Sequence, residues 1–296
     1  MEKFVDGIIM KSLSGFYYVE AAGHIYECRA RGIFRKKGQG TDAPLVGDRV
    51  NVCIPQTGMP MVDKVFERKN RLIRPPVANI DILVIVISTA DPAPNAFVID
   101  KMIAICEGKS IEPVLVFTKN DLKCDDEIVN AYKSAGFTCF SVSPDDISQL
   151  DEIRSCMAGR VSAFAGNSGV GKSTLLNLLD SRLAQRTDEI SKKLGRGKHT
   201  TRHVELFTLE NGALIADTPG FSSLELEEEQ IAEKENMWLC FREFEDFGND
   251  CKFKDCAHVK EKDCAVKKAL EDKKISQSRY ESYLKLYEEA KGYSKW

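Results

Sequence analysis

The first part of the chain, up to about residue 66, alternates between apolar and polar positions in short runs. These runs cover residues 7–10, 15–20, 24–30 and 49–54, and turn-forming residues separate them. A two-residue period indicates β-strands with one buried face. About five short strands at this spacing predict a small antiparallel β-barrel of the OB type.

From residue 80 the pattern changes to apolar runs that alternate with amphipathic segments. The apolar runs predict buried strands at 80–88, 113–117, 138–142 and 161–165. The segments between them predict helices at about 95–107, 125–135 and 146–157. Two more strands are expected at 204–209 and 213–216. This alternation is typical of a mostly parallel, doubly wound α/β domain.

Two other segments complete the predicted organisation. The stretch 67–76 is polar and basic and contains two adjacent prolines, so it is predicted to be a linker. Residues 265–290 predict helices whose packing residues are Tyr280, Tyr283, Leu284, Leu286 and Tyr287. We therefore expect a barrel over 1–66, an α/β domain over 67–224 and a mostly helical domain over 225–296.

Composition and charge exclude several classes of protein. A hydrophobic share of 43% and a charged share of 29% are ordinary for a globular protein. The apolar runs are too short to span a bilayer and no export signal is visible, so we expect a cytoplasmic protein without a membrane partner. Ten cysteines in such a protein favour free thiols or a metal site over disulfides.

A net charge of -3 gives no general attraction for nucleic acid, so any such binding depends on local patches. One basic loop is a candidate for an RNA platform. It contains Arg29, Arg31, Phe34, Arg35, Lys36 and Lys37. A barrel with a basic, aromatic-bearing loop suits nucleic acid, while a solvated charged turn is an equally good explanation of the same residues.

The candidate chemistry centres on a phosphate-loop pattern of glycine, four residues and Gly-Lys-Ser. Its members are Gly166, Asn167, Ser168, Gly169, Val170, Gly171, Lys172, Ser173 and Thr174. An expected strand precedes it and an expected helix follows, which is the context that phosphate loops require. Backbone N–H groups and the positive end of the helix suit phosphate oxygens. Lys172 is expected to reach the β- and γ-phosphates, and the Ser173 hydroxyl to bind Mg²⁺.

A second motif, Thr118-Lys119-Asn120-Asp121, follows the expected strand at 113–117. The Asp121 carboxylate can accept hydrogen bonds from N1–H and the amino group of guanine, and adenine has no matching pair of donors. The stem of Lys119 would lie on the base. A helix N-cap is the alternative for such a short motif. Ser141, Val142 and Ser143 end the next strand and could offer a backbone N–H to guanine O6, which is a weaker signal.

The segment Asp217-Thr218-Pro219-Gly220 follows the last expected strand. Asp217 is expected to hold Mg²⁺ through water, and the N–H of Gly220 to meet the γ-phosphate. A simple β-turn is the alternative. Between the two phosphate motifs lies a polar, glycine-bearing stretch. Thr201 is expected to bring its hydroxyl to Mg²⁺ from this stretch when the γ-phosphate is present, and Thr200 is the alternative.

Four potential metal ligands fall within fourteen residues near the C-terminus: Cys251, Cys256, His258 and Cys264. Three thiolates and an imidazole suit tetrahedral Zn²⁺ with no open position, which indicates a structural site. The alternative is a set of free cysteines beside a surface histidine. Cys240 lies outside the cluster and is predicted to be buried and inert.

The order of these motifs is unusual. Ordinary GTPases have the phosphate loop first, then the switch threonine, Asp-x-x-Gly and the guanine motif, whereas here the guanine motif comes first. This order, preceded by a barrel, resembles the circularly permuted GTPases, in particular the RsgA family of small ribosomal subunit biogenesis GTPases. The resemblance covers nearly the whole chain, and its motifs are specific in combination. Thr118 departs from the asparagine that GTPases more often carry, which could loosen base binding.

The resemblance implies a Cys-Cys-His-Cys zinc site and names His199 as the residue that positions or activates water. Phe221 stands where Ras-like enzymes have a glutamine that orients water, so we expect slow intrinsic GTP hydrolysis. The resemblance further implies a late assembly factor that binds GTP and GDP, contacts ribosomal RNA and is stimulated by the small ribosomal subunit. Lys172, Thr201 and His199 are the expected catalytic residues.

The alternative function is a GTP-sensing, RNA-binding module with negligible turnover. Asp121 argues against an ATPase. We expect a monomer.

Overall fold

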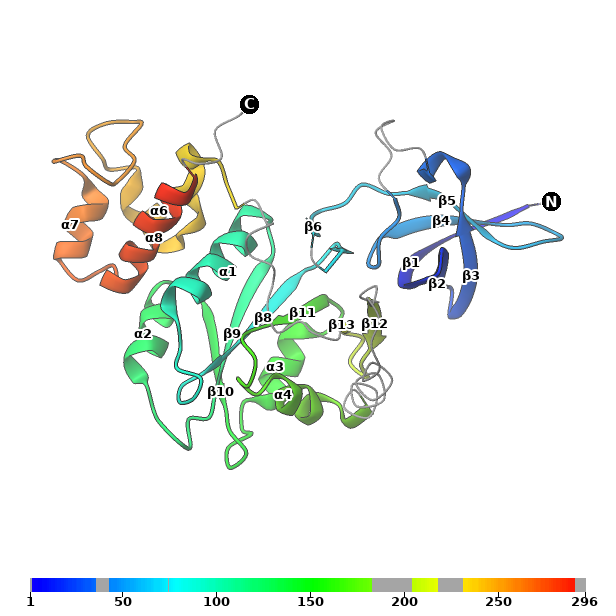
Figure 1. The fold of residues 1–296 in the computed structure, drawn as a ribbon, viewed down its shortest axis with the longest axis horizontal. Coiled ribbons are helices and arrows are strands. Elements are labelled where there is room, and N and C mark those ends of the chain that lie inside the picture. Colours follow the sequence, from blue (N-terminus) through cyan, green and yellow to red (C-terminus); the bar gives the residue numbers. More distant parts are fainter. Residues whose placement is uncertain (1, 36–42, 74, 183–203, 218–230, 291–296) are drawn as a thin grey trace, which may run out of the picture. The chain divides into compact units, whose positions relative to one another are not determined.

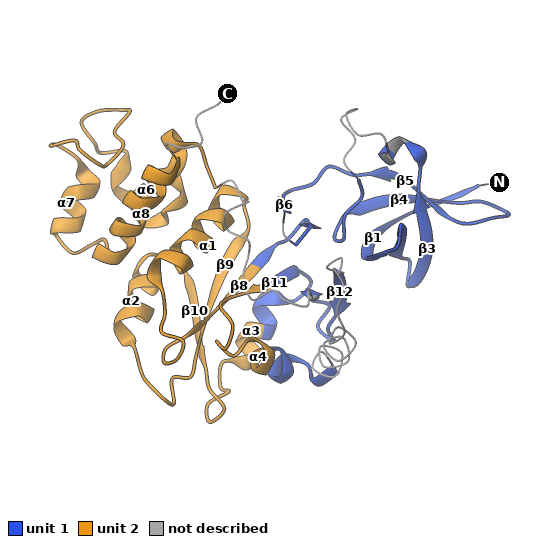
Figure 2. Cartoon of the chain, viewed as in Figure 1, with its two compact units in different colours: residues 1–82, 154–163, 176–221 blue, residues 83–153, 164–175, 222–296 orange. Residues whose placement is uncertain are grey.

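The computed structural model describes residues 2–35, 43–73, 75–182, 204–217 and 231–290. Contacts divide the chain into two compact units (Figure 2). The first contains residues 1–82, 154–163 and 176–221, and the second contains 83–153, 164–175 and 222–296. No helix in the described part of the chain combines the length and apolar character needed to cross a bilayer.

The N-terminal strands form a closed barrel (Figure 1). They are β1 (Lys3–Leu13), β2 (Phe16–Ala21), β3 (His24–Ala30), β4 (Arg49–Ile54) and β5 (Met61–Val65). Their order is β1-β2-β3-β5-β4, and β4 pairs back onto β1. Ile9, Val19, Cys28 and Val50 are fully buried inside it. The predicted OB-like barrel is confirmed, with one parallel pair, β3 and β5, among antiparallel ones.

The predicted linker is a folded segment, so the expectation of a plain linker over 67–76 was wrong. It carries a short hairpin of β6 (Arg71–Leu72) and β7 (Val77–Ala78). The buried Asn70 side chain bonds both the N–H and the carbonyl of Ile80, at 2.9 and 2.8 Å. Asn79 donates to the Gly47 carbonyl at 3.0 Å. Within 67–76, Arg68 donates to both carboxylate oxygens of the buried Asp48, next to β4, at 2.7 and 2.8 Å. Polar residues of this segment therefore make tertiary hydrogen bonds.

The first unit also contains the first three residues of β11 (Val161–Ala165), together with β12 (Glu205–Thr208) and β13 (Leu214–Asp217). β11 and β13 are parallel, and β12 runs antiparallel to β13. The backbone of Asp81 donates to the Val161 carbonyl at 2.8 Å, and its carboxylate accepts from Val161 N–H at 2.9 Å. The start of the strand that carries the phosphate loop is therefore held by the end of the folded linker segment.

The second unit contains strands in the order β10-β9-β8, namely β10 (Thr138–Val142), β9 (Glu112–Thr118) and β8 (Ile82–Ser88). β9 and β10 are parallel, and every residue of β8 is buried. The helices α1 (Ala96–Gly108) and α2 (Asp126–Ser134) follow β8 and β9. The predicted α/β domain is confirmed.

The helix expected from residue 146 begins later, as α3 (Leu150–Met157). A turn occupies the intervening residues, because Leu150 N–H donates to the Ile147 carbonyl at 3.0 Å. A second turn precedes it, in which Ser143 N–H donates to the Asp146 carbonyl at 2.9 Å and Asp146 N–H donates back at 3.2 Å. The alternation of apolar and polar residues continues through this stretch, so the pattern does not indicate that the helix begins only at Leu150.

The C-terminal elements are η2 (Lys234–Cys240), α6 (Arg242–Gly248), α7 (Ala265–Glu271) and α8 (Gln277–Ala290), and η2 and α8 pack against α1. Tyr280, Tyr283 and Leu286 are buried, which confirms them as packing residues. The rings of Phe244 and Tyr283 lie 5.0 Å apart in an edge-on arrangement. Cys240 is only 3% exposed, and burial raises the pKa of its thiol to about 12, in accord with the predicted inert cysteine.

A buried ionic cluster joins α8 to α1 and α6. The Arg279 guanidinium, 1% exposed, donates to the Asp100 carboxylate at 2.7 Å and to both oxygens of Glu243 at 2.7 and 3.0 Å. Tyr132 also donates to Asp100, at 3.0 Å. Burial raises the pKa of Asp100, and the Arg279 charge opposes that rise. Two carboxylates thus share one cation in a site that excludes water.

Arg279→Met should lower the free energy of unfolding by about 3–5 kcal/mol, because it leaves two carboxylates buried without a counter-ion. Glu289→Gln is the matched control, since Glu289 pairs with Lys101 across the same two helices at 2.7 Å but in a more exposed position. Its expected effect is below about 1 kcal/mol. Urea unfolding curves measure both. A loss at Arg279 no larger than at Glu289 would show that the cluster does not hold the helices together.

Candidate nucleotide site and metal centre

The predicted phosphate loop connects β11 to α4 (Lys172–Leu179). Gly166, Gly169 and Gly171 have φ angles of 144°, 81° and 94°, which are unfavourable for other residues. A Cβ on Gly166 would lie 2.3 Å from the Val86 carbonyl oxygen. The glycines are therefore required by the backbone path of the loop, which turns closely against β8.

The side chains of the loop leave its outer rim open to solvent. Asn167, Ser168, Ser173 and Thr174 are exposed, and Val170 is buried beneath them. The Lys172 ammonium folds over the loop and donates to the carbonyls of Gly166 and Asn167 at 2.7 and 2.8 Å. Burial lowers the pKa of Lys172. A bound phosphate oxygen could instead accept the hydrogen bonds that the Lys172 ammonium now donates to these two carbonyls.

The guanine motif lies against the phosphate loop, although the two are fifty residues apart in sequence. Lys119 donates from Nζ to the Gly169 carbonyl at 2.8 Å and also to the Asp91 carbonyl. The buried Thr118 hydroxyl lies 2.6 Å from the Val170 carbonyl oxygen. Both motifs belong to the second unit, drawn in orange in Figure 2. The structure thus brings 118–121 and 166–174 together.

The remaining two residues of the guanine motif differ in exposure. Asp121 is exposed and Asn120 is half-buried. Asp121 can therefore discriminate between bases only when a base covers it, since desolvation is what makes an unmatched carboxylate costly. Its roles in binding stay predictions.

The third segment ends β10 beside β9, with Val142 opposite Thr118. Ser141 N–H already donates to the Gln149 side chain at 2.6 Å, and Ser143 N–H to the Asp146 carbonyl at 2.9 Å. The segment lies at the correct edge of the sheet for a base contact. These two backbone donors are engaged within the protein, so the predicted contact with guanine O6 stays a prediction.

Several predicted site residues lie outside the described residues. They are His199, Thr200, Thr201, Gly220 and Phe221, together with the side chain of Asp217, whose backbone ends β13. Of the expected Mg²⁺ ligands, only Ser173 is described, at the exposed start of α4.

The loop after β8 contributes contacts that no sequence pattern indicates. Thr89 donates to the Thr118 carbonyl through both its N–H and its hydroxyl, each at 3.0 Å. The carbonyl oxygen of Asp91 accepts a hydrogen bond from the Lys119 ammonium. Both residues follow an apolar run in a polar, proline-containing turn that resembles an ordinary connection. Their partners are about thirty residues away along the chain, so spacing alone could not identify them.

The four predicted metal ligands converge, with their ligand atoms all within 4.8 Å of one another. His258 Nδ1 lies 3.5 Å from the sulfurs of both Cys251 and Cys264, and those sulfurs are 3.9 Å apart. A tetrahedral zinc ion with ordinary bond lengths implies edges of about 3.5 Å between nitrogen and sulfur and about 3.8 Å between sulfurs. The three distances among Cys251, His258 and Cys264 therefore match the edges of a tetrahedral metal site.

The surroundings of the cluster fix its ligands. Ala265 N–H donates to the Cys251 sulfur at 3.3 Å, and the Tyr280 hydroxyl donates to the His258 carbonyl at 2.8 Å. Burial raises the pKa of the Cys256 thiol to about 12. Buried thiolates therefore need a cation to form at neutral pH, which a bound metal ion supplies. The Cys₃His cluster is suited to hold a metal ion.

The turn within the metal cluster is held by Glu261. Its carboxylate accepts backbone N–H bonds from Ala257, Val259 and Lys260 at 3.2, 2.9 and 2.9 Å. Burial alone would raise the pKa of Glu261, but these bonds outweigh it and lower the pKa.

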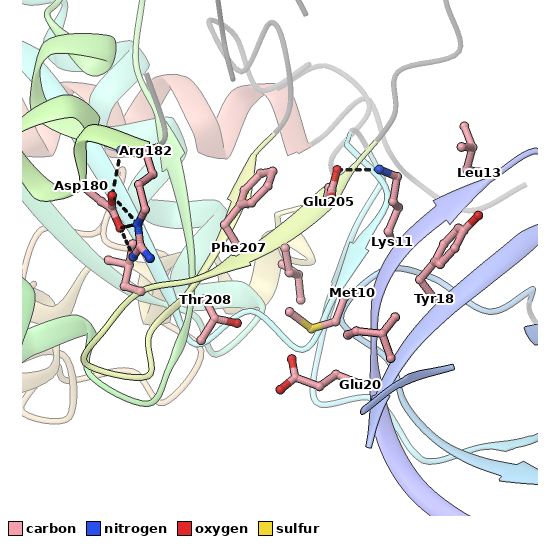
Figure 3. A pocket seen from close by; sticks show the side chains of 13 residues that line it. Met10, Lys11, Leu13, Tyr18, Glu20, Asp180, Arg182, Glu205, Phe207 and Thr208 are labelled. Carbon is pink, nitrogen blue, oxygen red and sulfur yellow. Dashed lines mark hydrogen bonds and ion pairs between the residues drawn. The ribbon is translucent and has the colours of Figure 1, made fainter. Parts of the chain in front are cut away.

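A separate hollow of about 580 Å³ lies in the first unit, between the barrel and β12 (Figure 3). Met10, Tyr18 and Phe207 contribute to its walls. Four charged residues that line it form two ion pairs, Lys11 with Glu205 and Arg182 with Asp180. Of the predicted site residues that the structure describes, none lines this hollow.

A guanine motif that precedes its phosphate loop in sequence and meets it in space defines a circularly permuted GTPase. The sequence models of two domain families match the chain: the RsgA GTPase over residues 65–227 and the RsgA N-terminal domain over residues 6–61. The chain belongs to the RsgA family.

Relatives and solved structures agree with this assignment. The "Small ribosomal subunit biogenesis GTPase RsgA" of Caldanaerobacter subterraneus is 41% identical over 97% of this chain and 96% of its own. RsgA 2 of Oceanobacillus iheyensis is 44% identical, over 96% and 97%. The crystal structure of YloQ, described as a circularly permuted GTPase, aligns with a TM-score of 0.79 and 34% identity over 99% of this chain and 97% of that one. YjeQ from Thermotoga maritima gives 0.80 and 32%, over 98% and 99%.

Purified chain should contain about one metal ion, and Cys256→Ser should remove most of it, because one of four ligands is lost from a closed site. Cys124→Ser is the control, since Cys124 is exposed and outside the cluster. Elemental analysis after gel filtration gives the stoichiometry. Full metal content in Cys256→Ser would mean that the cluster is not the metal site.

Proposed function

We propose that this chain is a GTPase that hydrolyses GTP to GDP and phosphate and acts in the biogenesis of the small ribosomal subunit. The observation that carries the proposal is the hydrogen bond from Lys119 to the Gly169 carbonyl, which joins the predicted guanine motif to the predicted phosphate loop. Membership of the RsgA family and the names of the relatives support it. We further propose that it acts as a cytoplasmic monomer.

In this proposal the phosphates lie over residues 166–174, within reach of the backbone N–H groups and Lys172. Mg²⁺, when bound, would neutralise charge between the β- and γ-phosphates. Ser173, Thr201 and Asp217 would hold it, directly or through water. The base would cover Asp121 and rest on the stem of Lys119, with 141–143 at its edge. Rate enhancement then comes from positioning and electrostatic stabilisation by groups that are fixed before the reaction begins.

The three predicted domains take different roles in this proposal. The barrel (1–66) and the helical domain (225–296) would contact ribosomal RNA, and the central domain (67–224) would bind the nucleotide. Arg29 supports an RNA role of the barrel, since it is exposed and lies over the Phe16 ring at 4.8 Å, as in surfaces that stack bases. Zn²⁺ is the metal we propose for the Cys₃His cluster, because its ligand set and dimensions suit that ion.

GTP turnover should be slow for the chain alone and rise by about tenfold to a thousandfold with purified small ribosomal subunits. The reason is that the chain lacks the glutamine that orients water in Ras-like enzymes, and a partner can supply the missing stabilisation of the transition state. The stimulated rate should fall steeply with salt as phosphate contacts weaken. Lys172→Ala is the control and should abolish both rates. Turnover that subunits leave unchanged at low salt would instead favour a GTP-sensing, RNA-binding module.

His199→Ala should reduce the stimulated rate by about a hundredfold or more and leave GTP affinity close to that of the unmodified chain. The reason is that a residue that positions or activates water acts on the reaction and not on ground-state binding. Single-turnover hydrolysis on the subunit, with binding measured separately, provides the comparison. An unchanged stimulated rate would remove His199 from the mechanism.

A further inference from the structure

The turn that carries two of the predicted metal ligands, Cys256 and His258, has a strained backbone. His258 has a φ angle of 55°, in the left-handed region that residues other than glycine seldom adopt. A residue keeps such a conformation only where surrounding contacts fix it. The contacts that fix this turn therefore determine where the His258 imidazole lies relative to the cysteine sulfurs.

The carbonyl groups of the turn are held by tyrosines of α8. The Tyr280 hydroxyl donates to the His258 carbonyl at 2.8 Å, and the Tyr283 hydroxyl donates to the Ala257 carbonyl. Both tyrosines are buried in the core of the C-terminal helices. These bonds occupy carbonyl oxygens only, so the backbone N–H groups of the turn need acceptors of their own.

The Glu261 carboxylate accepts hydrogen bonds from three of these N–H groups. Its Oε1 accepts from Ala257 at 3.2 Å, and its Oε2 accepts from Val259 and Lys260 at 2.9 Å each. The bonded N–H groups come before and after His258 along the chain. One side chain thus fixes the backbone on both sides of the only imidazole in the cluster.

We propose that Glu261 is a positioning residue for the metal centre. Its three hydrogen bonds set the turn that brings His258 Nδ1 and the Cys256 sulfur to the metal, and Glu261 itself is not a ligand. Lys267 of α7 donates to the Glu261 carbonyl at 3.2 Å, so the backbone of Glu261 is also fixed. The inference rests on the proposed zinc site and concerns a residue outside the ligand set.

The first test is the zinc affinity of Glu261→Gln. Glutamine keeps the length of the side chain, but it has one acceptor oxygen, and its NH₂ group meets a backbone N–H with another donor. Zinc affinity should fall about tenfold to a hundredfold, the usual effect of removing a group that orients metal ligands. Equilibrium transfer of zinc from the purified full chain to a chromophoric chelator gives the affinity.

Asp263→Asn is the matched control. It also removes one carboxylate charge near the cluster in sequence, but Asp263 forms an exposed ion pair with Lys252 at 2.9 Å. Its zinc affinity should stay within about twofold of that of the unmodified chain, since exposed pairs contribute little. An equal loss in both variants would show that negative charge, and not the three hydrogen bonds, sets the affinity.

The second readout separates positioning from general stability. Co²⁺ in place of zinc gives d–d absorption bands whose intensity depends on tetrahedral coordination. At saturating Co²⁺ the bands of Glu261→Gln should be weaker and shifted, because the His258 imidazole is displaced, whereas those of Asp263→Asn should match the unmodified chain. A loss of stability alone would leave the spectrum of the fully loaded site unchanged.

Thermal unfolding shows that each variant is folded at the temperature of the measurements. Glu261→Asp replaces the glutamine variant if that variant does not fold. Its carboxylate is one carbon shorter and does not reach all three N–H groups, so the same loss of affinity and the same spectral change are expected.

Three results would overturn the inference. They are normal zinc affinity in folded Glu261→Gln or Glu261→Asp, an equal loss of affinity in Asp263→Asn, and an unchanged Co²⁺ spectrum in the loaded Glu261 variant. Absence of bound metal from the unmodified chain would overturn the proposed zinc site itself, and so the two failures are distinguishable.

Discussion

The contact between the end of β9 and the phosphate loop is the constraint on which the rest of the site depends. Lys119 and Thr118 donate to consecutive carbonyls of the loop, at Gly169 and Val170. A phosphate loop by itself binds any nucleotide, and a carboxylate after a strand is by itself a helix cap. Held together at this junction, they can define one site with a base end and a phosphate end. Parallel strands make this possible, because their carboxyl ends meet at one edge of a sheet.

The two halves of this junction are held by different parts of the chain. The strand that carries the phosphate loop begins at Val161, where Asp81 and the folded linker hold it. The guanine half leads through α1 to the helical domain, where Arg279 links α8 to Asp100 of α1. Each half of the nucleotide site is therefore continuous with a different accessory domain, through hydrogen bonds in one case and a buried ionic cluster in the other.

The sequence predicted those features that depend on local pattern. Periodicity located the barrel strands and the α/β elements, and spacing identified the phosphate loop and the four ligands that meet around His258. It failed where polar residues serve tertiary contacts. Asn70 resembles a linker residue until its buried partner, Ile80, is known. The parallel pairing of β3 with β5 is non-local, and alternation along each strand contains no information about it.

The hydrogen bond of Thr118 illustrates the same limit. From the sequence the residue is an imperfect match to a motif, whereas in the structure its hydroxyl meets a carbonyl fifty-two residues away. Hydrogen bonds between distant loops depend on the path of the backbone, and no pattern along the chain encodes them directly. Motifs therefore predicted the residues of the site, and the fold shows which of them contact one another.

The most direct measurement of the central claim is the affinity of Asp121→Asn for GDP and for XDP. Asparagine offers an amide N–H to the oxygen that xanthine carries in place of the amino group of guanine, and guanine meets that N–H with another donor. If the exposed carboxylate beside Lys119 reads the base of a nucleotide held by the phosphate loop, the variant prefers XDP over GDP. Unchanged GDP affinity without any gain for XDP would contradict the account.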